Sequence, residues 1–319
     1  SKSGIGDRYT ALNDDTETSL LLFTAGTTGK PKGVLLSHET FSSFLLTNLE
    51  PADPDIIERT ALSVPLYHIA GIQALMASIY GGRTLVIQRQ FEPAQWLQLV
   101  ERERVTRTTL VPTMLKMVIE HPAFLDTDLS SLDTITYGAA PMPLEVIKRA
   151  IAVLPKVRFI NAFGQTETGA TISMLPPEDH DLSGSPEENT KKLRRLSSIG
   201  KPLPDVDVNI VDESGVVLPP GQIGEIIARG SRVMKGYWKQ ENATASTIQD
   251  GWLYTGDLGY IDEDGYIYLS GRAKDFIKRG AEMISPEEIE QVIYSHPAVD
   301  DAAVIGVPDA HWGEVVLAI

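Results

Sequence analysis

Strand-like apolar runs alternate with stretches of helical spacing over residues 19–174, and this alternation limits the fold more than any other feature of the sequence. One helical stretch places its apolar residues three or four positions apart, at Leu144, Ile147, Ile151 and Leu154. A strand-like run follows at residues 157–160. Because a helix between two strands returns the chain to the end of the sheet where the first strand began, the strands are expected to pair in parallel. The sequence therefore predicts an α/β fold, a layered lobe with a mostly parallel sheet.

The composition changes after this lobe. Residues 176–198 are polar, rich in proline and charged in runs, which is typical of a surface connection. Apolar and polar residues then alternate over residues 206–210, and turn signals such as Asp264-Gly265 separate further strand-like runs. These features predict an all-β segment, which we interpret as a small β-barrel subdomain.

A third unit is expected from Gly271 onward. A basic cluster there precedes forty residues, 280–319, that contain no lysine or arginine. Within them, residues 285–288 read Ser-Pro-Glu-Glu, a capping box with proline at the first helical position, so a helix is expected to begin at Pro286. We interpret this unit as the start of a small α+β C-terminal domain. The predicted boundaries are residues 1–190 for the α/β lobe, 191–270 for the β-barrel subdomain and 271–319 for a hinge and the truncated C-terminal domain.

Composition and charge exclude several classes of function. The formal net charge is −15, which argues against a nucleic-acid partner that is bound by neutralising many phosphates. The chain has no cysteine, which excludes disulfides and thiolate metal sites and favours a cytoplasmic location. The longest uncharged run lies between Arg59 and Arg83, but Pro65, His68 and Gly71 interrupt it, so we expect no membrane span. The oligomeric state is left open.

The strand-like run at residues 19–23 leads into a loop that is dense in hydrogen-bond donors. Its glycines free backbone N–H groups to face an anion, three threonine hydroxyls add donors, and Lys30 and Lys32 add charge, which together suit a polyphosphate. The spacing is not that of a Walker A loop, since Pro31 stands where a serine or threonine would bind Mg²⁺. A solvated turn is the alternative that composition alone allows. The predicted phosphate-binding residues are Thr24, Ala25, Gly26, Thr27, Thr28, Gly29 and Lys30.

Five segments in the same order resemble the adenylate-forming superfamily of acyl-CoA synthetases, non-ribosomal peptide adenylation domains and luciferases. The segments are the loop at residues 23–33, residues 65–71, residues 137–141, residues 161–167, and residues 254–257 followed by Gly271-Arg272. One such match would be weak, but five in order cover about residues 20 to 319. The resemblance implies ATP or AMP, Mg²⁺ and CoA as cofactors and a small-molecule carboxylic acid as substrate.

The resemblance also implies a nucleotide site. The residues that would contact the adenine with backbone, an amide and a ring face are Gly138, Ala139, Ala140, Pro141, Asn161, Phe163 and Gly164. Asp257 would accept both ribose hydroxyls, and Arg272 would donate from the other side. Without the resemblance, Asp257 would more often be an ordinary turn residue.

Further roles at the reacting groups follow from the same resemblance. Thr166 would contact the α-phosphate, and Glu167 would hold Mg²⁺, a hard cation that suits carboxylate oxygens. His68 would act near the bound carboxylate as a catalytic or acyl-pocket residue, and Lys274 would be the hinge about which the C-terminal domain rotates. From the residues alone, the alternatives are a cap-and-turn pair for Thr166-Glu167, a hydrogen-bonded, partly buried ring for His68, and an ordinary exposed lysine.

The segment after Pro65 indicates the kind of acid. Amino-acid-activating members of the superfamily commonly place an aspartate there, whereas this chain has no acidic residue between His68 and Glu92. We therefore expect an AMP-forming acyl-CoA synthetase, which converts a carboxylic acid, ATP and CoA into acyl-CoA, AMP and pyrophosphate through an acyl-adenylate. An acyl-AMP ligase or peptide-synthetase adenylation domain that loads a carrier protein is the alternative.

An inactive nucleotide-binding module is the alternative from another class. Members of the superfamily have a lysine near the far end of the C-terminal domain that contacts the reacting groups, and this chain has no basic residue after Arg279. The chain starts with Ser1 rather than methionine, and the first N-terminal subdomain of the superfamily is missing. We therefore expect a piece of a longer protein, with impaired activity of its own.

Overall fold

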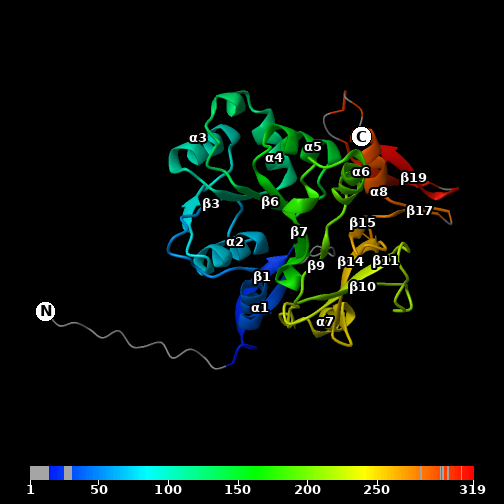
Figure 1. Ribbon diagram of the computed structural model, residues 1–319. Helices are drawn as coiled ribbons and strands as arrows, with labels where there is room; N and C mark the ends of the chain where they lie inside the picture. Colours follow the sequence, from blue (N-terminus) through cyan, green and yellow to red (C-terminus); the bar gives the residue numbers. More distant parts are fainter. Residues whose placement is uncertain are drawn as a thin grey trace.

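Figure 1 shows the computed structural model, which describes residues 14–24, 31–272, 274–280, 282–294, 296, 298–299, 302–309 and 311–319. Within this part of the chain the strands form four sheets, the largest of seven strands. Helices lie on both faces of that large sheet, and the chain ends beside the upper helices in this view (Figure 1). The architecture is therefore a layered α/β lobe followed by smaller β-rich units.

The seven-stranded sheet has the order β4-β3-β5-β6-β7-β8-β9. Strands β4, β3, β5, β6 and β7 pair in parallel, and β8 and β9 extend one edge in antiparallel fashion. The strands are β3 (Arg59–Leu62), β4 (Thr84–Ile87), β5 (Arg107–Leu110), β6 (Thr134–Gly138), β7 (Arg158–Gln165), β8 (Ala170–Leu175) and β9 (Lys201–Pro202). The predicted α/β fold with a mostly parallel sheet is confirmed.

Helices α3 (Pro93–Glu103), α4 (Pro112–Glu120) and α5 (Leu144–Val153) cover one face of this sheet (Figure 1). Trp96, Leu115 and Ile147 from these helices pack with Ile135 and Phe159 of the strands in the main hydrophobic core. The apolar spacing of these helices gives each one a face that burial stabilises. Helices α1 (His38–Asn48) and α2 (Ile69–Tyr80) lie on the opposite side of the sheet. Short 3₁₀ turns are η1 (Pro122–Asp126), η2 (Thr166–Thr168) and η3 (Pro177–Asp179).

The polar connection at residues 176–198 contains a helix that the sequence analysis did not predict. Helix α6 (Pro186–Arg195) has no buried residue, so it lacks the apolar face by which the other helices are found. Its start is fixed by a capping box, because Ser185 Oγ accepts from the Glu188 N–H at 3.3 Å while the Glu188 carboxylate accepts from the Ser185 N–H at 2.8 Å.

The all-β segment is an open sheet, and the prediction of a closed barrel is wrong. Its strands are β10 (Asp207–Val211), β11 (Gly224–Arg229), β13 (Ile248–Gln249), β14 (Trp252–Ile261) and β15 (Ile267–Arg272), and helix α7 (Glu241–Thr247) lies beside them. The order is β10-β11-β14-β13 with β15 also paired to β14, and among the described strands no pairing joins the ends. Ile210, Ile226 and Ile267 bury one face in a common cluster. Alternating residues predict two-faced strands but not whether a sheet closes on itself.

Two smaller sheets complete the described structure. Strands β1 (Thr18–Thr24), β2 (Lys32–Ser37) and β12 (Gly236–Tyr237) form one sheet, which joins the start of the lobe to the segment around residue 236. The C-terminal unit contains β16 (Ile277–Arg279), β17 (Glu282–Ile284), β18 (Val304–Asp309), β19 (Gly313–Ala318) and α8 (Pro286–Tyr294). Helix α8 begins at the residue that the sequence predicts. The boundaries after residues 190 and 270 stay predictions.

Among the described helices, none combines the length and the hydropathy that a membrane span requires.

Candidate functional site

The predicted adenine segment turns sharply at the end of β6. A Cβ atom on Gly138 would lie 2.1 Å from the Ala162 carbonyl oxygen, so only glycine lets β6 and β7 pair this closely. Ala139 follows with φ of 65°, in the left-handed region, and Ala139, Ala140 and Pro141 are exposed. The turn therefore presents backbone groups and small side chains at the carboxyl ends of the parallel strands, where open α/β sheets bind ligands.

Asn161 and Phe163 lie on the neighbouring strand β7. Asn161 is buried, and its Nδ2 donates to the Ser198 carbonyl at 3.2 Å. This contact leaves Oδ1 as the amide atom that can accept from an incoming N–H group. Phe163 is partly buried and packs in the clusters that contain Ile199 and Val206. Gly164 packs against β8, since a Cβ there would lie 1.6 Å from the Ala170 carbonyl oxygen.

Thr166 and Glu167 lie in the 3₁₀ turn η2 that follows β7. Thr166 is buried, and Glu167 is held at both its backbone and its side chain. The Met234 N–H donates to the Glu167 carbonyl at 2.8 Å, and the Tyr237 hydroxyl donates to Glu167 Oε1 at 3.0 Å. Glu167 is therefore fixed by a segment about seventy residues further along the chain.

Asp257 and Arg272 face each other across the antiparallel pair β14–β15. They are direct partners in the register, and Arg272 Nε donates to Asp257 Oδ1 at 3.1 Å. Asp257 is buried, whereas Arg272 is exposed. Burial raises the pKa of Asp257, the guanidinium opposes this effect, and the negative charges of Glu167 and Glu225 raise it further. The predicted ribose and magnesium residues therefore lie within electrostatic reach of each other.

Tyr237 contacts the predicted site residue Glu167, and the sequence analysis did not predict it. Besides its bond to Glu167, its ring lies 4.6 Å below the ammonium of Lys32, which follows the predicted phosphate loop. Burial and the Glu167 charge raise the pKa of Tyr237, so the phenol stays protonated as a donor. Gly236-Tyr237 has no spacing signal that relates it to residues 32 or 167. Its strand β12 pairs with β2, which begins at Lys32, and the Tyr237 hydroxyl reaches Glu167 from there.

His68 caps the first turn of α2 at the same edge of the large sheet. Its Nδ1 accepts from the Ala70 N–H at 3.2 Å, which requires Nδ1 to be unprotonated. Although His68 is among the exposed residues, desolvation by its surroundings lowers the pKa of the ring. The neutral imidazole therefore carries its proton on Nε2, where it can donate to a ligand oxygen.

The predicted phosphate loop and the predicted hinge residue Lys274 are not linked to the other predicted site residues by the described contacts. Residues 25–30 of the predicted phosphate loop lie outside the described residues. Thr24 and Lys32 on either side of them pair across β1–β2, so the loop connects the two strands of a hairpin. Lys274 is exposed in the turn after β15, and the described contacts do not link it to the other predicted site residues.

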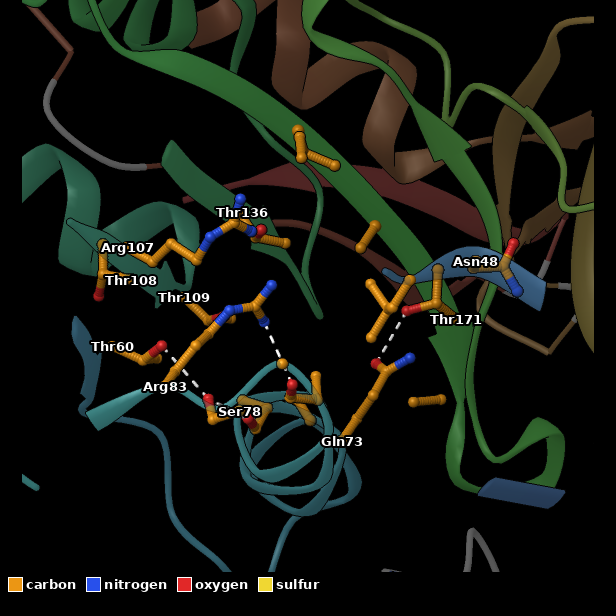
Figure 2. Close-up of a pocket in the computed structure, with 18 of the residues that line it drawn as sticks. Asn48, Thr60, Gln73, Ser78, Arg83, Arg107, Thr108, Thr109, Thr136 and Thr171 are labelled. Carbon is orange, nitrogen blue, oxygen red and sulfur yellow. Dashed lines mark hydrogen bonds between the residues drawn. The ribbon is translucent and has the colours of Figure 1, made fainter. Parts of the chain in front are cut away.

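A cavity of about 970 Å³ lies between α2 and the large sheet. Figure 2 shows residues of its wall, which come from α1, α2 and strands β3 and β5 to β8. His68, Gly138 and Ala139 line it as well, so one part of the cavity reaches the turn after β6. The structure therefore joins the predicted adenine turn and His68 to a pocket large enough for a small organic acid.

The predicted site offers few oxygen ligands to Mg²⁺. Glu167 supplies one fixed carboxylate, and among the described residues no three histidine, aspartate or glutamate side chains gather in a way that could hold a metal ion. A single carboxylate fits Mg²⁺ in sites where phosphate oxygens and water supply the other ligands. The residues present thus fit an ion that arrives with a nucleotide.

Comparisons with known proteins show the family of this chain. The family model described as "AMP-binding enzyme" matches residues 4–238, and the one described as "AMP-binding enzyme C-terminal domain" matches residues 288–319. A feruloyl-CoA synthase from Amycolatopsis sp. is 36% identical over 301 residues, which are 94% of this chain and 58% of that protein. The medium/long-chain-fatty-acid–CoA ligase FadD8 from Mycobacterium tuberculosis is 38% identical over 303 residues, 94% of this chain and 50% of the ligase.

A solved structure gives the same result. The o-succinylbenzoate CoA synthetase MenE from Bacillus subtilis, in complex with ATP and magnesium ion, superposes with a TM-score of 0.79 at 35% identity, covering 96% of this chain and 60% of that chain. The chain thus spans between half and three fifths of the length of these relatives. Since the family match covers more than half of the chain, the protein belongs to the AMP-binding enzyme family of adenylate-forming proteins.

Proposed function

We propose that this chain forms the nucleotide-binding part of an AMP-forming acyl-CoA synthetase. In the first step, a carboxylate oxygen attacks the α-phosphorus of ATP, the bond between the α-phosphorus and the bridging oxygen breaks, and pyrophosphate leaves. In the second step, the sulfur of CoA attacks the acyl carbon, the thioester forms, and AMP leaves with the electron pair of the broken bond. The similarity to CoA ligases over 94% of the chain supports this reaction class.

One observation supports the nucleotide site above all others. Asp257 is a buried carboxylate that retains an arginine partner and lies in the field of a second carboxylate, Glu167. An ordinary structural ion pair has no need of a further negative charge nearby, because that charge disfavours the ionised form. A ribose diol and a metal–phosphate group would satisfy both carboxylates, since hydroxyls donate to one and the cation neutralises the other.

The remaining assignments follow from position. We assign the turn at Gly138, Ala139, Ala140 and Pro141, with Asn161 and Phe163, to the adenine. We assign Thr166 to the α-phosphate, Glu167 to Mg²⁺, and Thr24 with residues 25–30 to the β- and γ-phosphates. When bound, Mg²⁺ would neutralise phosphate charge. Lys274 stays our proposed hinge residue.

His68 has a role that its own hydrogen bond suggests. Because Nδ1 accepts from the backbone, Nε2–H is available as a neutral donor at the edge of the cavity. A neutral donor orients a carboxylate without forming the tight ion pair that would lower its nucleophilicity. We therefore propose that His68 positions the acid and closes the cavity from the nucleotide side.

The composition of the chain bears on where the protein works and on its class of substrate. The absence of cysteine supports work in the cytoplasm, and the net charge of −15 supports small-molecule substrates over nucleic acid. We retain the division of the chain after residues 190 and 270 as the proposed boundaries.

Acid-dependent exchange of labelled pyrophosphate into ATP tests the first step in the complete protein that contains this chain. Thioester formation from the same acid is then measured with free CoA and with a phosphopantetheinylated carrier protein. Exchange together with acyl-CoA supports the proposal. If exchange occurs but the acyl group is transferred only to the carrier protein, the acceptor is the carrier and not CoA. The absence of exchange across a broad panel of carboxylic acids would refute adenylation.

A further inference from the structure

Strand β14 bulges away from β11 at the residue that we assign to the ribose. The register between the two strands shifts there, so that residues 255–257 of β14 lie opposite Ile226 of β11 alone. On its other side β14 stays paired with β15, where Asp257 lies opposite Arg272. A β-bulge next to a functional site aims a side chain that a regular strand would place elsewhere. The bulge at residues 255–257 therefore sets the direction of the Asp257 carboxylate.

Side chains accept from the backbone N–H groups within this bulge. The Gly256 N–H donates to Glu225 Oε1 of β11 at 2.9 Å. The Asp257 N–H donates to Thr255 Oγ1 at 3.1 Å, and the Thr255 hydroxyl donates to the Ile226 carbonyl at 2.7 Å. An unpaired N–H group that is removed from water costs about as much free energy as a lost hydrogen bond. Glu225 thus supplies an acceptor that the interrupted ladder between β11 and β14 does not.

Gly256 depends on this acceptor because packing does not hold it. Its φ is 77°, in the left-handed region. Within the described part of the chain, no atom beyond its chain neighbours lies within 4 Å of the place that a Cβ would occupy. Glycine also has more conformational freedom to lose than any other residue. The hydrogen bond to Glu225 therefore restrains the backbone directly before Asp257.

The other side of the bulge contacts the turn that carries the proposed metal residue. Gln165 directly precedes the 3₁₀ turn η2, and its Nε2 donates to the Thr255 carbonyl at 3.4 Å. The bulge thus lies between Glu225 and the turn that contains Glu167. A shift of its backbone would move Asp257 relative to Glu167.

The charge of Glu225 does not itself favour the ionised form of Asp257. Burial raises the pKa of Asp257, Arg272 opposes this effect, and the negative charges of Glu167 and Glu225 raise the pKa further. Glu225 therefore disfavours the carboxylate that a ribose diol requires. Any benefit of Glu225 to the site has to come through the backbone, by its contact with Gly256.

These contacts identify a residue that supports the nucleotide site from outside. We propose that Glu225 is a positioning residue for the ribose, because it holds the bulge that aims Asp257 at the two hydroxyls. Glu225 acts through Asp257 and makes no contact with the nucleotide of its own. This inference rests on the proposed function, in which Asp257 accepts from the ribose diol.

The test compares AMP with 2′,3′-dideoxy-AMP, which lacks both ribose hydroxyls. Their dissociation constants are measured by titration calorimetry, without Mg²⁺, on the complete protein that contains this chain. The adenine and the phosphate are common to both probes, so the ratio of the two constants reports the hydroxyl contacts. We expect the wild type to bind AMP about tenfold or more tightly than the dideoxy compound. In Asp257→Ala this preference should fall to within about twofold.

Variants of Glu225 separate its acceptor from its charge. Glu225→Ala removes the acceptor, so the preference should fall to within about threefold. Glu225→Gln keeps an acceptor for the Gly256 N–H and removes the repulsive charge, so its preference should equal or exceed that of the wild type. In the Asp257→Ala background, the further change Glu225→Ala should leave the ratio unaltered, because Glu225 acts through Asp257.

The matched control is another carboxylate that accepts from the backbone of the same sheet. Asp262 lies just after the end of β14, and its Oδ1 accepts from the N–H groups of Asp264 at 3.0 Å and Tyr266 at 2.9 Å. Asp262→Ala should therefore keep the wild-type preference for AMP. This control shows that loss of a backbone acceptor elsewhere in the sheet does not change the ratio.

The outcomes distinguish this inference from the proposed function. If the wild type does not bind AMP, or does not prefer it to the dideoxy compound, the proposed nucleotide site is wrong, and the inference is overturned with it. If Asp257→Ala removes the preference but Glu225→Ala keeps it, the inference alone is overturned.

Two further results would also refute the role of Glu225. One is that Glu225→Ala weakens both probes by the same factor, which would mean general support of the fold. The other is that Glu225→Gln loses the preference as Glu225→Ala does, since the acceptor for Gly256 would then not be what matters. Should Glu225→Ala not fold, Glu225→Met, which has the length of glutamine without its amide, decides the question by the same ratio.

Discussion

The Tyr137 hydroxyl and Nε2 of His180 lie 2.9 Å apart in the core beneath the end of β6. His180 Nδ1 lies 2.9 Å from the Pro176 carbonyl, which can only accept, so Nδ1 must carry the proton. Nε2 therefore accepts from Tyr137, and the ring is neutral. This pair ties the segment around residue 180 to the strand that ends in the proposed adenine turn.

The neutral state of His180 makes the stability of the fold pH-dependent. Burial lowers its pKa from 6.5 to about 4, although the Pro176 carbonyl and the charges of Asp179 and Glu178 partly oppose this shift. Because the unfolded chain binds the proton more tightly, the stability is complete above pH 6.5 and is lost as the pH falls from 6.5 towards 4. The full loss is roughly 3 kcal/mol.

Urea denaturation between pH 7 and pH 4 measures this effect. His180→Gln cannot take up the proton, so its unfolding free energy should decline less than that of the wild type over this interval. His311→Gln, at an exposed position, should follow the wild-type curve. A constant difference between wild type and His180→Gln at all pH values would contradict the prediction.

Asp257 should control both the strength and the pH dependence of AMP binding. Asp257→Ala removes an acceptor that is charged and should weaken AMP binding by about 1.5–3 kcal/mol. Because burial raises the pKa of this carboxyl, AMP affinity should begin to fall at a higher pH than for an ordinary aspartate. Calorimetric titrations with AMP at several pH values measure both effects.

The control for Asp257 comes from the same sheet. Asp207 pairs with Arg229 at 2.8 Å on β10–β11, but it is exposed. Asp207→Ala should leave AMP affinity unchanged. Equal affinities for wild type and Asp257→Ala would exclude the ribose assignment.

Tyr237 should tune the magnesium requirement through Glu167. Tyr237→Phe removes the bond at 3.0 Å that fixes the carboxylate, so the half-saturating Mg²⁺ concentration for pyrophosphate exchange in the complete protein should rise by about tenfold. AMP affinity measured without Mg²⁺ should not change. Glu167→Gln should show a larger loss of Mg²⁺-dependent rate. Tyr260→Phe, on the neighbouring sheet, should behave as wild type, and an unchanged Mg²⁺ response in both site variants would argue against the metal role.

The helices and parallel strands were predictable because their apolar spacing is a local signal. Helix α6 was missed although residues 185–188 read Ser-Pro-Glu-Glu, the same four letters that predicted α8 at residues 285–288. The capping box is therefore enough to predict the start of a helix even where no apolar face follows. The prediction of a closed barrel was wrong because the alternation of apolar and polar residues does not define which strands lie at an edge of the sheet. Tyr237 could not be found from sequence, since its partner Glu167 is 70 residues away.

A buried ion pair beneath the site provides the last prediction. Arg232 is fully buried, with Nε 3.1 Å from Asp205 Oδ2, and Asp205 also accepts from Ser43 and Asn48 of α1 at 3.0 Å each. Burial lowers the pKa of Arg232 to about 10, and Asp205 opposes this effect. Met234, two residues further along, holds the Glu167 carbonyl, so the pair supports the backbone that positions the proposed metal residue.

Removing one partner of this pair should cost far more than removing both. Asp205→Asn leaves an uncompensated charge and should lower the unfolding free energy by about 3–5 kcal/mol, whereas the double variant Asp205→Asn with Arg232→Met should recover much of that loss. Denaturant unfolding of the two single variants and the double variant gives the coupling between them. Additive losses would mean that the two side chains are stabilised independently of each other. In that case the support of Glu167 would have to come from Tyr237 and the Met234 backbone alone.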